Sequence, residues 1–424
     1  MNAIVETSMP LSARLRGALE NRTVQVVVLA VVTLLVLLYR RPDQFSHPYM
    51  WGEDGVVNTV HYAQSGWASL WQPVAGYYTL PIKLIYLISS SLSFRWFPEI
   101  SLWLTTAFTF ASLAAVAFAP TLLRWRWLCA VAVLLIPTGA ENFAVSLFAG
   151  WWGSILALLA LLWNTEQRRT GLRLGLLFVG ALSTPLIIAI APLFALRLFW
   201  YRHRDEVITV VAAALLAGLQ LYALTHSPGP PKADSLGYDT LLMLEKFFGY
   251  YTVVSLEFVA HGWIQLAGAA LVVFIAAAGV FDRRSLGMAF ALLALALAAN
   301  ILISIVRTPL PLVHPVVTTP RYFFFPYLLT SWMLIQLAAV PTRVTQVIAI
   351  LALALGVRNA VEHGQHRHEP IDWRAHVDSC TRSPTYQLPV HTVGLAASTW
   401  SVSLTGEQCR QMVQRSLFDN QVTP

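Results

Sequence analysis

The feature that most constrains this chain is a series of long apolar segments, which recur from residue 24 almost to residue 360. A helix needs about 20 apolar residues to cross the hydrocarbon core of a bilayer, and within that core only helices and closed barrels satisfy all of their backbone polar groups. Charged residues make up 12% of the chain, whereas soluble domains carry about 25%. The sequence therefore predicts an all-α polytopic membrane protein. The apolar segments lie near residues 24–40, 79–93, 99–119, 125–138, 150–163, 172–200, 207–225, 263–281, 285–306, 322–340 and 343–359.

Arginine-rich loops predict how the chain threads the membrane, because cytoplasmic loops collect lysine and arginine. Two segments are ambiguous: 79–93 is short and contains three consecutive serines, and 172–200 is broken by Ser183-Thr184-Pro185. If 79–93 stays at the outer surface and 172–200 crosses twice as a short hairpin, the arginine-rich loops face the cytoplasm. The alternative threading moves the five arginines from Arg124 to Arg173 outside. We therefore expect about eleven crossings, with the N-terminus in the cytoplasm and the C-terminus outside.

The chain divides into a transmembrane domain, residues 1–361, and a small extracytoplasmic C-terminal lobe, residues 362–424. This lobe is predicted because the last part of the chain is polar and of mixed charge. Cys380 and Cys409 both lie in it, and a pair of cysteines in an oxidising compartment predicts a disulfide. The histidine tract 363–368 looks like a metal-binding tract, but its mixed-charge surroundings favour a solvated linker.

The first outer loop, residues 41–98, contains an acidic motif, Trp51-Gly-Glu-Asp-Gly55. Carboxylates beside a bilayer are costly unless they are solvated, paired or used. Two interpretations are open: an acidic cap for a helix that starts near Val56, or a general base held in a cleft. We expect Asp54 rather than Glu53 to be the base, because it is shorter and adjoins Gly55. Adjacent residues of an extended loop point to opposite sides, so only one can face a substrate.

Cations on the same predicted side of the membrane are candidates for holding an anion. Arg307 and Arg321 bracket a proline-rich loop that contains His314, and Lys83 interrupts an apolar run. Arginine grips phosphate through two parallel hydrogen bonds. The alternative is an arginine that snorkels from a helix end to the interface. Glu141-Asn142 is the other polar pair on this side, either a loop cap or a contact for a sugar hydroxyl or a divalent cation.

These features together resemble the GT-C superfamily of membrane glycosyltransferases that use polyprenyl-phosphate sugars, and are similar to bacterial O-antigen-modifying glucosyltransferases. The resemblance covers most of residues 24–360. The motifs that carry it are Trp51-Gly-Glu-Asp-Gly55, Gln72-Pro-Val-Ala-Gly-Tyr77, the pair Glu141-Asn142 before Trp151-Trp152, and Arg321-Tyr322 before Pro326.

The resemblance implies an inverting hexosyl or pentosyl transferase of a bacterial inner membrane. Such an enzyme moves a sugar from a polyprenyl-phosphate donor to an extracytoplasmic glycan or lipid-linked acceptor. A carboxylate takes the acceptor proton, and fixed cations stabilise the leaving phosphate. The residues expected in these roles are Asp54 or Glu53 as base; Arg321, Arg307, Lys83 and His314 at the donor phosphate; and Trp51, Tyr77, Tyr78, Glu141 and Asn142 at the sugar or acceptor.

The expected partners are the lipid bilayer, the polyprenyl-phosphate sugar and the acceptor. Nucleic acid is not expected, because the net charge of +7 belongs to basic loops beside anionic lipid headgroups. No cofactor is implied, although Glu53, Asp54 and Glu141 are oxygen ligands of the kind that Mg²⁺ or Mn²⁺ takes. Two alternatives remain: a transporter or flippase for a lipid-linked sugar, and a polysaccharide polymerase.

Overall fold

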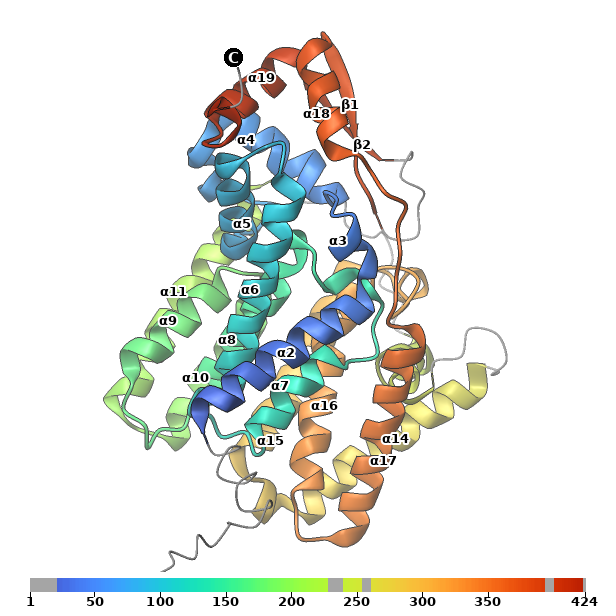
Figure 1. Cartoon of the computed structure of the whole chain (residues 1–424). Coiled ribbons are helices and arrows are strands. Elements are labelled where there is room, and N and C mark those ends of the chain that lie inside the picture. Colours follow the sequence, from blue (N-terminus) through green and yellow to red (C-terminus); the bar gives the residue numbers. More distant parts are fainter. Residues whose placement is uncertain (1–20, 228–238, 254–260, 393–399, 422–424) are drawn as a thin grey trace, which may run out of the picture.

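The computed structural model describes residues 21–227, 239–253, 261–392 and 400–421, and it is mainly helical (Figure 1). Within these residues six helices are long and apolar enough to cross a membrane. The all-α membrane fold predicted from the apolar segments is therefore confirmed. The six helices are α2 (Arg22–Arg40), α6 (Phe97–Phe118), α11 (Arg204–His226), α14 (His261–Phe281), α15 (Arg283–Arg307) and α17 (Arg343–His363).

A second set of apolar helices is too short to cross a membrane alone. At a rise of 1.5 Å per residue, helices of 9 to 15 residues extend only about 14–23 Å. The segment 172–200 breaks where its serine, threonine and proline predict, between Ala181 and Leu186. The short helices are α5 (Leu80–Leu92), α7 (Arg126–Leu134), α8 (Ala149–Leu161), α9 (Thr170–Ala181), α10 (Leu186–Trp200) and α16 (Phe324–Ala338).

Two of these short helices form the centre of the molecule. Every residue of α16 is buried, and Trp151 is the one residue of α8 that is not. Helix α16 packs against α7, α15 and α17, and α8 packs against α5, α6 and α9. Since both helices are enclosed by others, their ends lie inside the protein rather than at its surface. Smaller helices fill the connections: α3 (Pro42–Ser46), α4 (Val60–Ser65), α12 (Thr240–Leu244) and α13 (Tyr250–Thr252).

The connecting loops gather into two groups. In one group, Arg124 donates a hydrogen bond to the carbonyl oxygen of Ala339 (3.1 Å) and another to that of Ser285, which joins three arginine-rich loops. In the other, the backbone N–H of Gly139 donates to the carbonyl oxygen of Pro315 (2.6 Å). These are the two groups that the arginine distribution assigns to opposite faces of the membrane.

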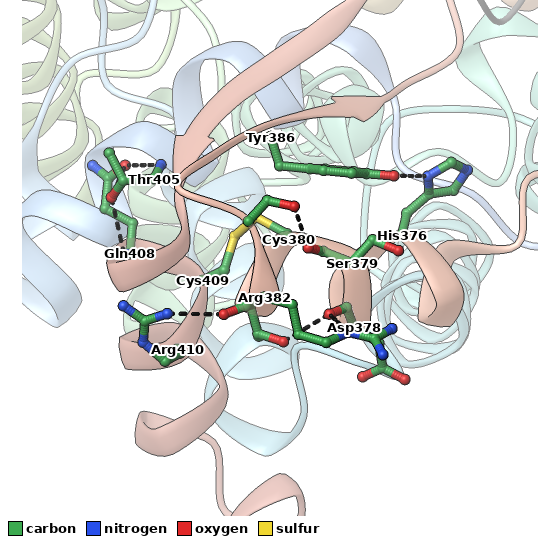
Figure 2. The surroundings of a disulfide bond; sticks show 12 residues. His376, Asp378, Ser379, Cys380, Arg382, Tyr386, Thr405, Gln408, Cys409 and Arg410 are labelled. Carbon is green, nitrogen blue, oxygen red and sulfur yellow. Dashed lines mark hydrogen bonds between the residues drawn. A yellow bond between two sulfur atoms is a disulfide. The ribbon is translucent and has the colours of Figure 1, made fainter.

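The C-terminal segment folds into two helices and a hairpin. The antiparallel strands pair from Thr385 opposite Thr405 to Pro389 opposite Ser401. A disulfide between Cys380 and Cys409, with Cα atoms 6.0 Å apart, joins the two helices (Figure 2). The elements are α18 (Trp373–Arg382), β1 (Thr385–Pro389), β2 (Ser401–Thr405) and α19 (Gly406–Arg415).

This C-terminal segment covers the connection between α5 and α6. The indole N–H of Trp373 donates to the carbonyl oxygen of Phe94 (2.9 Å), and the Asp419 carboxylate accepts from the backbone N–H of Phe94 (2.8 Å). Figure 1 shows α18, α19 and the hairpin at the same end of the molecule as α4 and α5. The last part of the chain therefore packs on the loop that contains the acidic motif.

Candidate functional site

A cavity of about 400 Å³ lies where several of the short helices begin. The first turns of α5, α8, α10 and α16 line it, and the second half of α15 forms a further wall. A helix N-terminus carries a partial positive charge, so it attracts anions. The lining residues from these five helices are Ile82, Trp151, Leu186, Phe325, Asn300, Ile303 and Ser304.

Glu53 and Arg321 are the charged residues among those that line the cavity. The guanidinium Nη1 of Arg321 donates to Glu53 Oε1 at 3.0 Å and to Glu141 Oε1 at 3.4 Å. The Arg321 side chain is 25% exposed and that of Glu141 only 3%. Burial opposes the charge on Arg321, but Glu141 and Glu53 together raise its pKa. Arg321 is thus held as a cation at the cavity wall between two carboxylates.

Glu141 is a buried carboxylate with spare hydrogen-bonding capacity. Burial raises its pKa to about 7; Glu53 adds to this rise, whereas Arg321 and Arg41 oppose it. Its Oε2 atom and both side-chain polar atoms of Asn142 have no hydrogen-bond partner among the described residues. The loop reaches Arg321 because Gly139 lies against the proline-rich loop: a Cβ there would approach the carbonyl oxygen of Val316 to 2.7 Å.

The acidic motif is helical, so the expectation of an extended loop is wrong. Gly52 and Glu53 are helical, and residues Asp54–Thr59 form a π-helical turn. The Asp54 carboxylate is completely buried and accepts hydrogen bonds from the Asn58 amide (2.9 Å) and the Ser146 hydroxyl (2.5 Å). Burial raises the pKa of Asp54 to about 6, against the hydrogen bonds from Ser146 and Asn58.

Two consequences follow for the acidic pair. Asp54 is not among the residues that line the cavity, and its side chain ties the π-helical turn to the loop before α8 rather than capping a helix. Glu53 is the carboxylate that lines the cavity, next to Arg321. The structure therefore brings together Glu53, Arg321 and Glu141, while Asp54 lies behind them.

Three aromatic residues were predicted to contact the sugar or the acceptor, and the structure places only one of them, Tyr77, in the cavity lining. Tyr77 lines the cavity, at the end of a tight turn in which Val74 and Tyr77 exchange backbone hydrogen bonds. Tyr78 does not line it; its backbone N–H and carbonyl oxygen bind the side chain of Gln220 (2.9 and 3.1 Å). Trp51 is 2% exposed and packs edge-to-face on Phe148, outside the cavity lining.

Lys83 and His314 do not line the cavity wall with Arg321. Lys83 is buried, and its ammonium lies 2.9 Å from Nδ1 of His61. His314 accepts hydrogen bonds from two backbone N–H groups of its own loop, so it supports that loop's conformation. Burial lowers the pKa of His314 to about 4, and Lys246 adds to this effect. The side chain of Arg307 lies outside the described residues.

Several lining residues are not identified by the sequence pattern. The turn Thr184-Pro185-Leu186 lines the cavity, although the break in its apolar segment indicates only a hairpin turn. Asn300 and Ser304 also line it from α15. The sequence does contain one indication of them: two polar residues four apart in an otherwise apolar segment lie on the same face of a helix, which predicts a polar surface there.

Each of the three carboxylates considered for a divalent cation already has a charged or hydrogen-bonding partner, although Oε2 of Glu141 has none among the described residues. The Arg321 guanidinium lies between Glu53 and Glu141, and both oxygens of Asp54 accept hydrogen bonds. Among the described residues no group of three or more histidine, cysteine or carboxylate side chains is arranged to hold a metal ion. The charged groups that meet at the cavity wall are Arg321, Glu53 and Glu141.

Comparisons of the chain with protein-family models, curated proteins and solved structures find no match. What the site can do is therefore inferred from its own groups. These are a fixed cation, one carboxylate that lines the cavity, converging helix N-termini and apolar walls.

Proposed function

We propose that this protein is a membrane glycosyltransferase of the GT-C type. It moves a sugar from a polyprenyl-phosphate donor to a glycan or lipid-linked acceptor at the extracytoplasmic face of a bacterial inner membrane. One observation carries the proposal: the first turns of four helices and the Arg321 side chain line a single cavity whose other walls are largely apolar. Helix N-termini and arginine suit a phosphate group, and apolar helix walls suit the first isoprene units attached to it.

The reaction requires a group that takes a proton and a group that stabilises a leaving phosphate. As the acceptor oxygen bonds to the anomeric carbon, the bond from that carbon to the phosphate oxygen breaks. Glu53 receives the acceptor's hydroxyl proton, and the polyprenyl phosphate leaves with negative charge opposite Arg321. The transition state resembles an oxocarbenium ion, and attack opposite the leaving group inverts the sugar.

The resting contact between Glu53 and Arg321 fits this scheme. An ion pair of 3.0 Å holds both groups at the cavity. A donor phosphate that attracts Arg321 would release Glu53 to act as a base. Glu141, the second carboxylate on Arg321, keeps the guanidinium in position during this exchange. Asp54 has a supporting role, since it fixes the turn that begins after Glu53.

The proposal includes the threading of the chain. We propose about eleven passes through the membrane: the six long helices span it, and the short helices α7, α8, α9, α10 and α16 make their passes together with the loops that continue them. In this threading α9 and α10 form a hairpin and α5 lies at the outer surface. The N-terminus is then cytoplasmic, and residues 362–424 are extracytoplasmic. The grouping of loops supports this arrangement, because the acidic motif contacts both Arg321, at the end of the proline-rich loop, and His391 of the C-terminal segment.

The test is sugar transfer by the purified protein in proteoliposomes. The donor is a radiolabelled polyprenyl-phosphate hexose, and the acceptors are lipid-linked glycans. Glu53→Gln should lower turnover by about 10²–10⁴, the usual contribution of positioned acid–base catalysis. Arg321→Ala should lose donor binding and turnover together, and Arg321→Lys should retain part of both. Glu362→Gln, in an exposed ion pair with Arg358, is the matched control and should transfer at the wild-type rate.

The outcomes separate the proposal from its alternatives. If Glu53→Gln and Arg321→Ala both transfer sugar normally, Glu53 is not the base and Arg321 does not stabilise the leaving phosphate, so the mechanism is wrong. Movement of a fluorescent lipid-linked sugar across the vesicle, unaffected by Glu53→Gln and without any transfer, would instead identify a flippase. Extension of an acceptor from a polyprenyl-diphosphate glycan alone would identify a polymerase.

A further inference from the structure

The C-terminal segment is bonded directly to the acidic motif. The backbone N–H of Gly52 donates to the carbonyl oxygen of His391 (2.8 Å), and the N–H of His391 donates to the carbonyl oxygen of Met50 (3.2 Å). Trp51 and His391 thereby form a parallel β-bridge. Glu53 is the second residue after Trp51, directly after the bonded Gly52. The direction of its side chain consequently depends on a contact with the far end of the chain.

The two glycines of the motif face the same C-terminal segment. A Cβ atom on Gly52 would lie 2.5 Å from the Thr392 side chain, and one on Gly55 would lie 2.6 Å from that of Val402 and 2.8 Å from that of Val390. Ordinary side chains do not approach so closely. Glycine is therefore required on both sides of Glu53 and Asp54, because Val390, Thr392 and Val402 pack against the backbone there.

A cluster of histidines holds residues 390–392 in this position. The rings of His368 and His391 lie 4.5 Å apart, and those of His366 and His368 lie 4.4 Å apart. Tyr49 contacts both His368 (5.1 Å) and His391 (4.3 Å). Although this tract was expected to be solvated, the His368 side chain is only 4% exposed. The titratable and charged groups that face one another here are Arg41, Asp43, Tyr49, His366, His368 and His391.

Hydrogen bonds connect this cluster to the segment that contacts the acidic motif and to the loop that contains Glu141. Asp43 accepts from Tyr49 (2.6 Å), and Nε2 of His368 lies 3.0 Å from the carbonyl oxygen of Thr392. Arg41, which is paired with Asp43, also donates to the carbonyl oxygens of Ala140 and Phe143, on either side of Glu141. The cluster thus supports the backbone of both carboxylates that contact Arg321.

His391 has room for one ring proton but not for two. Its Nε2 lies 2.7 Å from the carbonyl oxygen of Glu369, to which an N–H can donate. Its Nδ1 is buried and has no partner among the described residues. A second proton would create a buried N–H without an acceptor, which is costly. It would also add a positive charge beside His368 and near Arg41.

We propose that residues 390–392 form an acid-sensitive clasp, which holds Glu53 at the cavity and is released when His391 and the nearby His366 take up protons. The clasp as a structural device stands apart from the enzymatic proposal. Its effect on catalysis rests on the proposed role of Glu53. It gives the protein an active form near neutral pH and a loosened form in acid.

The direction of the pH dependence follows from the ring environments. Burial lowers the pKa of His391 to about 4, and His368 contributes further; burial and His368 also lower the pKa of His366 to about 4. A freed histidine has a pKa of about 6.5. Between these values the released segment binds more protons than the docked one, so docking weakens as the pH falls. For each proton that the released segment binds and the docked segment does not, the docking equilibrium constant changes about tenfold per pH unit.

Hydrogen–deuterium exchange of the full-length protein in detergent tests the clasp without any substrate. Peptides covering residues 48–58 and 386–392 should lose protection as the pH falls from 6.5 towards 4.5, by about tenfold per unit for each linked proton, after correction for intrinsic exchange. Peptides from α8 should stay protected throughout. In His391→Gln the side chain can still donate to the Glu369 carbonyl but does not titrate. The slope of log protection against pH should therefore correspond to one linked proton fewer than in the wild type.

His47→Gln is the matched control, since His47 is an exposed histidine of the same loop and should leave the wild-type slope unchanged. Wild-type protection that is flat from pH 7.5 to 4.5 overturns the clasp, and this measurement needs no variant to fold. An unchanged slope in His391→Gln overturns the role of His391. Sugar transfer combined with flat exchange would reject the clasp alone, whereas pH-dependent exchange without transfer would reject only the proposed enzyme.

Discussion

Replacing Glu141 by glutamine should stabilise the protein at alkaline pH. The native environment raises the Glu141 pKa from 4.5 to about 7, and each pKa unit corresponds to about 1.4 kcal/mol. Because the folded-state pKa is the higher one, the carboxyl's contribution is complete below pH 4.5 and is lost as the pH rises through 7. Ionised Glu141 therefore costs the native state about 3 kcal/mol at pH 8. Glutamine has the same shape and does not ionise, so Glu141→Gln avoids this cost.

Unfolding of the detergent-solubilised protein measures the effect. Melting temperatures of wild type and Glu141→Gln are compared at intervals from pH 5 to pH 8.5. The two should nearly coincide at pH 5 and diverge as the pH rises, with the variant more stable. Sugar transfer should fall in the same variant, because Arg321 loses one of its two carboxylate partners. Stability and activity would then change in opposite directions, as is common for functional groups.

A particular pattern would refute this reasoning. If the melting temperatures of the two proteins stay parallel from pH 5 to pH 8.5, Glu141 does not titrate as a buried carboxyl. If Glu141→Gln is less stable than wild type at pH 8, the ion pair with Arg321 outweighs the cost of burial. Glu362→Gln, at an exposed position, should follow wild type at every pH.

Two further substitutions test the packing of the chain. Gly55→Ala should destabilise the protein by about 1–3 kcal/mol in thermal unfolding, because its Cβ would overlap Val402. Gly175→Ala, whose Cβ meets no neighbouring atom within 4 Å, should be tolerated. Equal tolerance of both would mean that the C-terminal hairpin does not pack closely on the motif. The buried Glu206 carboxylate pairs with both Arg173 (2.9 Å) and Arg197 (3.0 Å). Glu206→Gln should cost about 3–5 kcal/mol, because it leaves these two buried arginines without their shared carboxylate. A loss as small as that of Glu362→Gln would contradict the buried network.

The fold was predictable where the bilayer dictates it. Apolar runs of sufficient length must form helices in a membrane, which is why the long helices lie close to the segments chosen from sequence. The break at Ser183-Thr184-Pro185 was predictable for the same reason, since proline disrupts a continuing helix. Arg321 was selected because an arginine amid aromatic residues at a helix start suits a phosphate group, with snorkelling to the interface as the alternative.

The arrangement around Glu53 was not predictable, because contacts between distant residues determine it. The sequence alone favoured Asp54, on the assumption of an extended loop. The π-helical turn and the Asp54–Ser146 hydrogen bond place Glu53 at the cavity instead. Likewise, nothing local to the histidine tract shows that His368 is buried against Tyr49, because the two are 319 residues apart.

That long separation has a consequence for how the protein is made. At translation rates of about 5–20 residues per second, roughly 15–60 s pass between synthesis of Tyr49 and synthesis of His368. During this interval the first loop exposes apolar residues such as Met50 and Tyr86, which the C-terminal segment later covers. A nascent chain is thus open to chaperones and proteases at this loop until its end has been made. A product cut short before α18 would keep the six long apolar helices of the described residues and still lack the support of its acidic motif.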